Sequence, residues 1–284
     1  MTSRRVIVNA DDLGWSPGVT DGVLLAHRSG IVTSASLTAN MPDAERALGL
    51  TGAEPALGVG IHLNVCQGRP MSDAGAKLGD SDGLMRLAGA GLIARCLLRP
   101  WLIGAALAEF EAQIRWVLDR GVRPTHLDSH RHIHAFPPLF AGVVRLARRY
   151  GIPCVRWPRE RLPGPGWLRP PRGQARTARL LRVMCALNAL TGRSLRPARG
   201  TWGIAHTGAI GEAWLIRAAQ TAPEGITEIM IHPGLPHDLD HRETRLLDSR
   251  QRELEALCSP VVRQAFAEQQ VELVHYGHLR SPGH

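Results

Sequence analysis

Lysine is nearly missing from this chain of 284 residues, in which Lys77 is the only one. Arginine therefore carries almost all of the formal net charge of +9, and its planar guanidinium binds carboxylate and phosphate through two parallel hydrogen bonds. Aromatic residues are also scarce, at 5% of the sequence, so few side chains can stack on nucleotide bases. Because no nucleic-acid-binding motif is recognisable either, we expect no nucleic-acid partner, despite a sequence pI near 10.5.

Closely spaced cysteines and long uninterrupted apolar runs are absent too. The five cysteines are dispersed, at positions 66, 96, 154, 185 and 258, which argues against a disulfide framework and a thiolate zinc site. The start of the chain has no apolar stretch long enough for a secretory signal, so we expect a cytoplasmic protein. The segment 91–110 is apolar, but Arg95, Arg99 and Pro100 argue against a membrane span. It is predicted to be an amphipathic helix pair that packs on the fold or touches a bilayer surface.

Short and long apolar patterns alternate along the chain. Runs typical of strands occur at 6–8, 31–37, 57–63, 152–156, 226–231 and 271–276. Helical patterns lie at 17–29, 43–50, 106–120, 137–150, 174–190, 211–221 and 243–257. This alternation predicts parallel strands joined by helices, in a (β/α) barrel or a doubly wound sheet. We expect one domain over 1–284, with an Arg/Pro/Gly-rich insertion near 158–200.

Polar residues are concentrated in four stretches where strands should end. These stretches are NADD at 9–12, GIHLN at 60–64, THLDSHRHIHAFP at 125–137 and EIMIHPG at 228–234. In parallel α/β folds, side chains at the carboxyl ends of the strands converge on one face, where active sites are built. The four stretches are therefore predicted to meet in space.

Together these stretches offer the ligands of a metal site. One carboxylate and two imidazoles bind a divalent ion and leave positions open for water and substrate. The adjacent Asp11 and Asp12 need not share a role, because successive side chains of an extended backbone point in opposite directions. One of them can hold the ion while the other takes a proton from its water.

Each stretch taken alone also fits a structural role. Adjacent aspartates at a strand end are most often a turn or a helix cap. A lone His62 is more often a satisfied core or rim residue, and His232 before Pro-Gly could shape a turn. The segment HLDSHRHIH at 126–134 is different, because four histidines and an aspartate within nine residues exceed what a packed strand-to-loop transition needs.

In this order, and spread over nearly the whole chain, the four stretches resemble the YdjC-type carbohydrate deacetylases. GIVTSASLTAN at 30–40 and SRQRELEALCSPVVRQAF at 249–266 extend the likeness. That family is similar to the polysaccharide deacetylases, so the resemblance implies a distorted (β/α) barrel and a divalent metal ion. It also implies an enzyme, a carbohydrate N-deacetylase that removes acetyl groups from N-acetylated amino sugars.

The resemblance carries roles over by position. It implies the metal ligands Asp12, His62 and His130, with Asp11 as general base and His232 as general acid. The remaining residues become supporting or substrate-contacting groups, namely Asn64, His126, Asp128, His132 and His134. His126 and His130, four residues apart, could both reach an ion if that stretch were helical, whereas the family pattern favours a ligand from each of two strand ends. The family implies Mg²⁺, although Zn²⁺, Co²⁺ and Mn²⁺ suit two imidazoles as well or better.

The substrate leaves several alternatives open. The chain is similar to a hopanoid-biosynthesis branch of the family in GIVTSASL, CVRWPRE and HTGAIGEAWLIRAA, which implies a lipid-linked N-acetylglucosamine headgroup as substrate. One alternative substrate is a soluble chitooligosaccharide. Another alternative is hydrolysis of a different bond, such as a phosphoester. Within 174–190 a basic amphipathic helix is predicted, with three arginines at 176, 179 and 182 and an apolar face of Leu180, Val183, Met184, Leu187 and Leu190. Such a helix can lie on an anionic bilayer, or it can pack on the barrel or against a second subunit of a homodimer.

Overall fold

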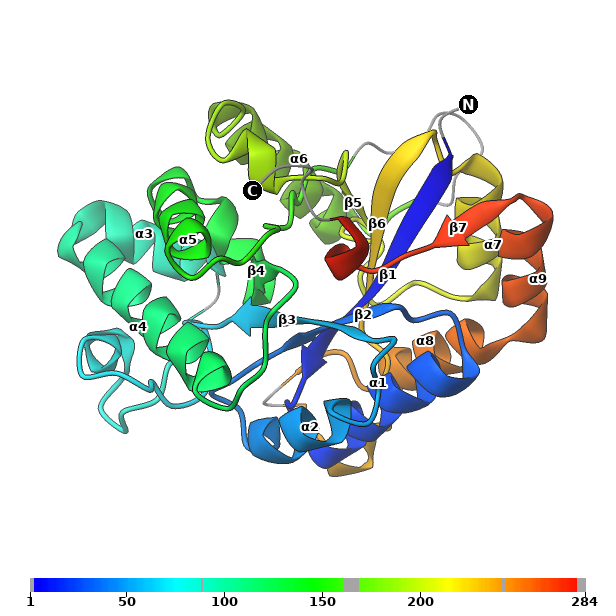
Figure 1. Cartoon of the computed structure of the whole chain (residues 1–284). Helices are drawn as coiled ribbons and strands as arrows, with labels where there is room; N and C mark the ends of the chain where they lie inside the picture. Colours follow the sequence, from blue (N-terminus) through cyan, green and yellow to red (C-terminus); the bar gives the residue numbers. More distant parts are fainter. Residues whose placement is uncertain (1–2, 88, 161–168, 242–243, 280–284) are drawn as a thin grey trace.

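A parallel β-sheet, curved into a barrel and wrapped by helices, organises the chain (Figure 1). The computed structural model describes residues 3–87, 89–160, 169–241 and 244–279. Six strands follow one another in the order β4-β3-β2-β1-β6-β5, and β7 pairs with the start of β1. The strands are β1 (Arg4–Leu13), β2 (Ser34–Leu37), β3 (Gly58–Leu63), β4 (Leu127–Ser129), β5 (Thr201–Trp202), β6 (Gly225–Ile231) and β7 (Val271–Leu273).

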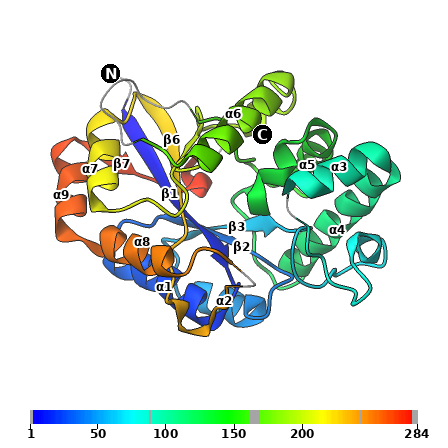
Figure 2. The ribbon, with the colours of Figure 1, turned by 180° about the vertical axis from the view of Figure 1, so that it is seen from behind.

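Helices cover the outside of this sheet, as the view from behind also shows (Figure 2). The α-helices are α1 (Pro17–Ser29), α2 (Ala44–Thr51), α3 (Gly89–Leu98), α4 (Trp101–Leu118), α5 (Pro137–Arg149), α6 (Arg172–Leu187), α7 (Glu212–Thr221), α8 (Asp248–Cys258) and α9 (Pro260–Glu268). Short 3₁₀ turns are η1 (Gly75–Leu78), η2 (His130–Ala135), η3 (Arg193–Leu195), η4 (Pro236–Asp238) and η5 (Tyr276–Leu279). No helix in the described ranges is both long enough and apolar enough to cross a membrane.

An irregular segment fills the gap between β4 and β5. Val155 makes a single parallel bridge to Leu127 of β4, and the hydroxyl of Thr201 in β5 donates to the carbonyl of Trp157 at 3.1 Å. The strand predicted at 152–156 is thus a bridge rather than a regular ladder. The prediction of a distorted α/β barrel is confirmed.

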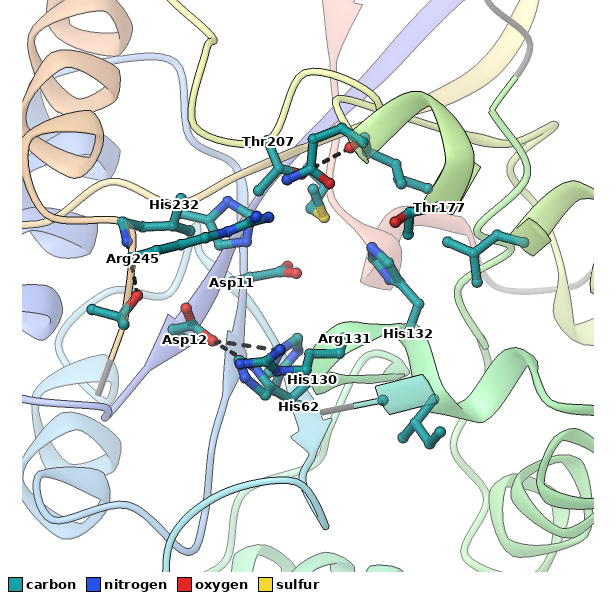
Figure 3. A pocket seen from close by; sticks show the side chains of 18 of the residues that line it. Asp11, Asp12, His62, His130, Arg131, His132, Thr177, Thr207, His232 and Arg245 are labelled. Carbon is teal, nitrogen blue, oxygen red and sulfur yellow. Dashed lines mark hydrogen bonds and ion pairs between the residues drawn. The ribbon is translucent and has the colours of Figure 1, made fainter. Parts of the chain in front are cut away.

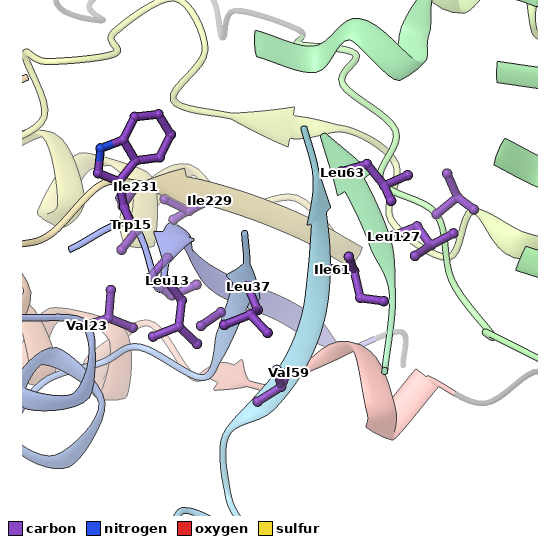
Figure 4. Close-up of a cluster of buried hydrophobic side chains, with 14 of the residues drawn as sticks. Leu13, Trp15, Val23, Leu37, Val59, Ile61, Leu63, Leu127, Ile229 and Ile231 are labelled. Carbon is purple, nitrogen blue, oxygen red and sulfur yellow. The ribbon is translucent and has the colours of Figure 1, made fainter. Parts of the chain in front are cut away.

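The sheet register separates a core face from a site face. Leu13 is level with Leu37, Leu37 with Ile61, and Ile61 with Leu127, so one row of aliphatic side chains crosses four strands (Figure 4). This row belongs to the main buried cluster, together with side chains of α1 and α4. Because side chains alternate along a strand, the next pair in the register, His62 and Asp128, faces the opposite way, into the barrel.

Helix α1 shows how local sequence signals position these layers. Its N-cap Ser16 accepts a hydrogen bond from the N–H of Val19 at 3.3 Å, and Pro17 occupies the first turn, where no N–H is needed. Gly22 then allows close packing, because a Cβ there would lie 2.5 Å from the Cα of Gly234. This contact holds α1 against the chain that follows β6.

Predicted and observed elements differ mainly at short segments. The segment 91–110 forms parts of two helices, α3 and α4, separated at Arg99 and Pro100. Helix α8 begins at Asp248 rather than 243, and α9 was not predicted. The segment predicted as an insertion, 158–200, contains α6 and η3, while its residues 161–168 lie outside the described ranges. The single-domain assignment stays a prediction.

Candidate active site

A pocket of about 580 Å³ lies where β1, β3 and β6 end (Figure 3). All five residues given metal-binding or catalytic roles line it: Asp11, Asp12, His62, His130 and His232. They come from strand ends and from η2, far apart in the sequence. The predicted convergence of the strand-end stretches is therefore what the structure shows.

Asp12 breaks the regular course of β1. Its φ of 68° is left-handed, and the register between β1 and β2 shifts between Ala10 and Leu13. Aspartate tolerates this backbone region better than most residues. The side chains of Asp11 and Asp12 thus point in different directions because the backbone makes a left-handed turn at Asp12. The expected cause, simple alternation along an extended strand, does not apply.

The two carboxylate oxygens of Asp12 differ in their contacts. Oδ2 accepts a hydrogen bond from Nη2 of Arg250 at 2.6 Å. Oδ1 is buried without a hydrogen-bond partner and lies 3.6 Å from Nε2 of His62 and 3.3 Å from Nδ1 of His130. Burial alone would raise the pKa of Asp12, but the guanidinium of Arg250 and the two imidazoles hold it well below its usual value.

His62 is oriented through its other ring nitrogen. Nδ1 lies 2.9 Å from Oδ1 of Asp128, which turns Nε2 towards Asp12. Burial tends to lower the pKa of His62, but the carboxylates of Asp128, Asp11 and Asp12 outweigh it and raise the pKa to about 9. A carboxylate on the second nitrogen is the usual support of a metal-binding histidine, since it fixes the ring and increases its basicity.

His130 is placed by an unusual backbone turn. Arg131 and His132, which follow it in η2, both have left-handed φ values, 55° and 54°. The ring of His130 stands edge-on to that of His62, with centroids 5.6 Å apart, and lies 5.0 Å from the ring of Trp15. Left-handed residues of this size cost about 1 kcal/mol or more each, so the surrounding contacts must hold this turn in place.

The donor set fits a divalent cation. Ligand atoms of Asp12, His62 and His130 all lie within 4.8 Å of one another. The orphaned Oδ1 of Asp12 would gain the partner that it lacks, since a buried oxygen left without one is costly. One carboxylate and two imidazoles suit Zn²⁺, Co²⁺ or Mn²⁺ at least as well as Mg²⁺.

Asp11 is held by a residue to which the sequence assigned no role, Arg156. Its guanidinium is fully buried and donates to both oxygens of Asp11, from Nη1 to Oδ2 at 2.8 Å and from Nη2 to Oδ1 at 2.6 Å. The same group also contacts Asp128 at 2.6 Å and Glu228 at 2.8 Å. The available signal was an arginine inside an apolar run, CVRW, where only a paired charge can be buried.

Ser36 connects the two halves of the site. Its hydroxyl donates to Oδ2 of Asp128 at 2.8 Å and accepts from Nδ2 of Asn9 at 2.9 Å, while Asn9 also donates to Asp11. The carboxylate that orients His62 and the neighbouring Asp11 are therefore parts of one hydrogen-bond network. Neither Asn9 nor Ser36 was predicted as a site residue.

His126 lies behind this network and not beside Asp12. Its Nε2 is 3.0 Å from Ser36 Oγ, its ring stacks on Tyr276 at 4.1 Å, and a Cβ on Gly60 would collide with it at 2.2 Å. Helical pairing of His126 with His130 at one ion is thus not what the structure shows. The three residues that could hold an ion together, Asp12, His62 and His130, come from β1, β3 and η2.

His232 directly follows β6, and one of its ring nitrogens has no hydrogen-bond partner. Its backbone N–H donates to Glu253 at 2.5 Å, while its buried Nδ1 has no hydrogen-bond partner. Burial lowers the pKa of His232 to about 4, although the carboxylates of Asp12 and Asp11 oppose this shift. The imidazole is therefore neutral at neutral pH in the ligand-free protein and has a nitrogen available for proton exchange.

The other predicted residues divide into one pocket residue and two structural ones. His132 lines the pocket, and its Nδ1 has no hydrogen-bond partner. His134 is buried between the Ser129 hydroxyl at 2.6 Å and the carbonyl of Arg156 at 3.2 Å. Asn64 shapes its own loop, because its side chain bonds Asn40, Cys66 and Gln67.

At its strand ends this parallel α/β barrel carries an Asp-His-His cluster that could hold a metal ion and a carboxylate held by a guanidinium, a layout suited to a hydrolase. The chain belongs to the YdjC-like protein family, whose model matches residues 5–268. The family predicted from the sequence is thereby confirmed.

Two relatives match almost end to end. A carbohydrate deacetylase of Brevibacillus brevis is 31% identical over 279 residues, which cover 97% of this chain and 99% of the relative. A chitooligosaccharide deacetylase of Salmonella paratyphi B is 31% identical over 280 residues, covering 93% and 95%. A crystal structure from Enterococcus faecalis V583 shares the fold, with a TM-score of 0.78 and 23% identity, and covers 99% of this chain and 100% of that one.

Proposed function

We propose that this protein is a metal-dependent carbohydrate deacetylase, which hydrolyses the N-acetyl group of an amino sugar. Carbohydrate deacetylation is the activity of both relatives matched over almost their full lengths. The observation that carries the metal dependence is the buried, unpartnered Oδ1 of Asp12 facing two imidazole nitrogens. Asp12, His62 and His130 would hold the ion.

The residues around this cluster supply the rest of the reaction. When bound, a divalent ion lowers the pKa of a coordinated water and polarises the acetyl carbonyl. Asp11 accepts the proton of the attacking water. Its Oδ1 already accepts two hydrogen bonds, from Asn9 and Arg156, whereas Oδ2 accepts one, from Arg156, so a lone pair of Oδ2 stays available.

His232 delivers a proton to the amine as the C–N bond breaks. Because burial holds its pKa near 4 in the ligand-free protein, it must first take up a proton in the substrate complex. Its free Nδ1 in the pocket is the structural support for this role. In the overall reaction, water is added across the amide bond, and acetate and a free amine are released.

The substrate in this proposal is an N-acetylated amino sugar that is lipid-linked, with the N-acetylglucosamine headgroup of a hopanoid as one form. Support comes from the pocket, whose far wall is aliphatic and includes Ile93, Leu181 and Met184. Aromatic platforms, on which sugar rings often stack, are limited here to Trp15 among the described lining residues. A soluble chitooligosaccharide is the alternative, and a cytoplasmic location and a homodimer stay predictions.

Acetate release tests the proposal directly. Metal-stripped protein is supplied with Mg²⁺, Mn²⁺, Co²⁺ or Zn²⁺ and assayed on N-acetylglucosamine, chitooligosaccharides and a lipid-linked N-acetylglucosamine, with a chelator control. We expect metal-dependent acetate release, fastest on the lipid-linked form. His62→Ala should abolish it, whereas His278→Ala, on an exposed turn, should not. Phosphate release from a phosphoester panel without acetate release would overturn the proposal.

A further inference from the structure

Exposed apolar side chains are concentrated in two segments of the chain. Of the nine large hydrophobic side chains that are exposed among the described residues, all but Leu25 and Val261 lie at positions 97–101 or 180–190. In the first segment Leu97 is 67%, Leu98 81% and Trp101 66% exposed. Apolar surface gathered in this way marks a binding surface more often than isolated exposed leucines do.

Helix α6 presents two apolar faces. Leu181 and Met184 are buried against the barrel, next to Ile204 and Met230. Val183 is 59%, Leu187 71% and, just past the helix, Leu190 88% exposed. Of the apolar face predicted from the sequence, Met184 therefore packs inward while the other members point out, so packing on the barrel does not account for them.

Helices α3 and α6, which carry most of these exposed residues, both contribute to the lining of the pocket, α3 through Ile93 and α6 through Leu180. Helices α3 and α6 both contact η2, and Ile93 of α3 packs against the cluster that contains Leu181 and Met184. In both views α3 lies on the side of the molecule away from α7 and α9, and α5 lies between α3 and α6 (Figures 1 and 2). Leu180 lines the pocket and is 50% exposed, so it joins the aliphatic wall of the pocket to the outer surface.

The charged side chains around these exposed residues are positive. Exposed arginines on α6 are Arg172, Arg176, Arg179 and Arg182. The sequence has no acidic residue between Glu160 and Glu212, and none between Asp82 and Glu109. A second copy of the chain would bring like charges together here, whereas an anionic surface would be attracted.

We propose that α3, the start of α4 and α6 form a docking surface for an anionic lipid bilayer, with the aliphatic side of the catalytic pocket adjoining it. The exposed leucines and Trp101 would enter the interface while the arginines contact lipid headgroups. The role of the surface in substrate delivery rests on the proposed function, because only a lipid-linked substrate needs it. Docking to the bilayer does not rest on the proposed function.

Vesicle sedimentation tests the surface on the full-length, metal-loaded protein. Vesicles contain phosphatidylcholine alone or phosphatidylcholine with 30% phosphatidylglycerol, at low and high salt. We expect binding to the anionic vesicles at low salt, at least about tenfold stronger than to neutral vesicles, and weakened by salt. Absence of binding to anionic vesicles at low salt would overturn the proposal.

Matched variants locate the surface. Val183→Ser/Leu187→Ser/Leu190→Ser should reduce vesicle binding at least about tenfold, whereas Leu25→Ser/Val261→Ser, exposed apolar positions on α1 and α9, should leave it unchanged. Arg179→Gln/Arg182→Gln, which removes no apolar packing, should reduce binding about thirtyfold. Wild-type binding by both the serine and the glutamine variants would contradict the assignment.

Acetate release from a water-soluble N-acetylated amino sugar separates the two proposals. The serine variant should keep wild-type turnover of that substrate, because none of its three positions lines the pocket. Vesicle binding by a protein that releases no acetate from any substrate would overturn the proposed function and leave the docking surface standing. A wild-type dimer that ignores vesicles and becomes monomeric in the serine variant would assign the surface to self-association instead.

Discussion

Arg156 and Asp11 form a two-pronged ion pair inside the barrel, with Nη1–Oδ2 at 2.8 Å and Nη2–Oδ1 at 2.6 Å. The two residues are 145 positions apart in the sequence, and both side chains are buried. Because the pairing is bidentate, the carboxylate cannot rotate without losing a charge-assisted hydrogen bond. The guanidinium thus fixes the direction in which the remaining lone pair of Asp11 points.

Arg156→Lys keeps the charge but removes the fork, so it tests this orientation. We expect kcat to fall at least about a hundredfold, with a loss of stability of about 3–5 kcal/mol because three carboxylates lose partners. Acetate release at saturating substrate measures kcat, and urea unfolding measures the stability. A lysine variant with near-normal kcat would show that Asp11 does not need the fork.

Substitutions of Asp11 and Asp12, made one at a time, should differ in their effects on kcat and on metal binding. Asp11→Asn should reduce kcat by about 10²–10⁴-fold while metal stays bound, because it removes a base and not a ligand. Asp12→Asn should weaken both, since it removes the carboxylate opposite the two imidazoles. Metal content by elemental analysis, together with kcat, distinguishes the two. Equal metal loss in both variants would mean that the carboxylates share the ion.

Glu160 should make stability depend on pH. It is 4% exposed and accepts the N–H groups of Gly203 and Ala205, yet burial raises its pKa to about 7 from an ordinary 4.5. The folded state therefore binds the proton more tightly, and the free energy of unfolding contributed by this group falls as the pH rises from about 4.5 to 7.

Glu160→Gln tests this by difference. The amide lacks the titration, and its altered hydrogen bonding costs the same at every pH. Between pH 5 and pH 8 the stability of the variant relative to the wild type should therefore rise by about 2 kcal/mol. Urea unfolding at the two pH values measures the change. If the stability of the variant and that of the wild type changed in parallel with pH, the titration of Glu160 would not contribute to stability in this range.

Much of the site could be predicted because strand ends converge in parallel folds. Buried runs marked three strand ends at NADD, GIHLN and EIMIHPG, and four of their polar residues meet in the pocket: Asp11, Asp12, His62 and His232. The proposed ligand set also depended on the resemblance, because ligand chemistry alone left His126 and His130 equivalent. Only the fold shows His126 stacked on Tyr276, behind the network.

The parts that escaped prediction depend on contacts between distant residues. Arg156 and Arg250 bind carboxylates 145 and 238 positions away, and no local pattern specifies such partners. The left-handed φ of Asp12 is likewise set by its surroundings, since neighbouring residues suggest a continuing strand. Strands as short as Leu127–Ser129 and Thr201–Trp202 carry too few residues for a periodic signal.

His232 should matter in proportion to the basicity of the leaving group. A sugar amine leaves only when protonated, whereas an activated phenolate needs little protonation. His232→Ala should therefore reduce kcat on an N-acetylated amino sugar by about 10²–10⁴-fold, but on 4-nitrophenyl acetate by less than about tenfold. His278→Ala serves as the matched control, because that ring lies on the exposed turn η5. Equal losses on amide and ester would assign His232 to holding the site together rather than to proton transfer, and the free Nδ1 would then need another partner in the substrate complex.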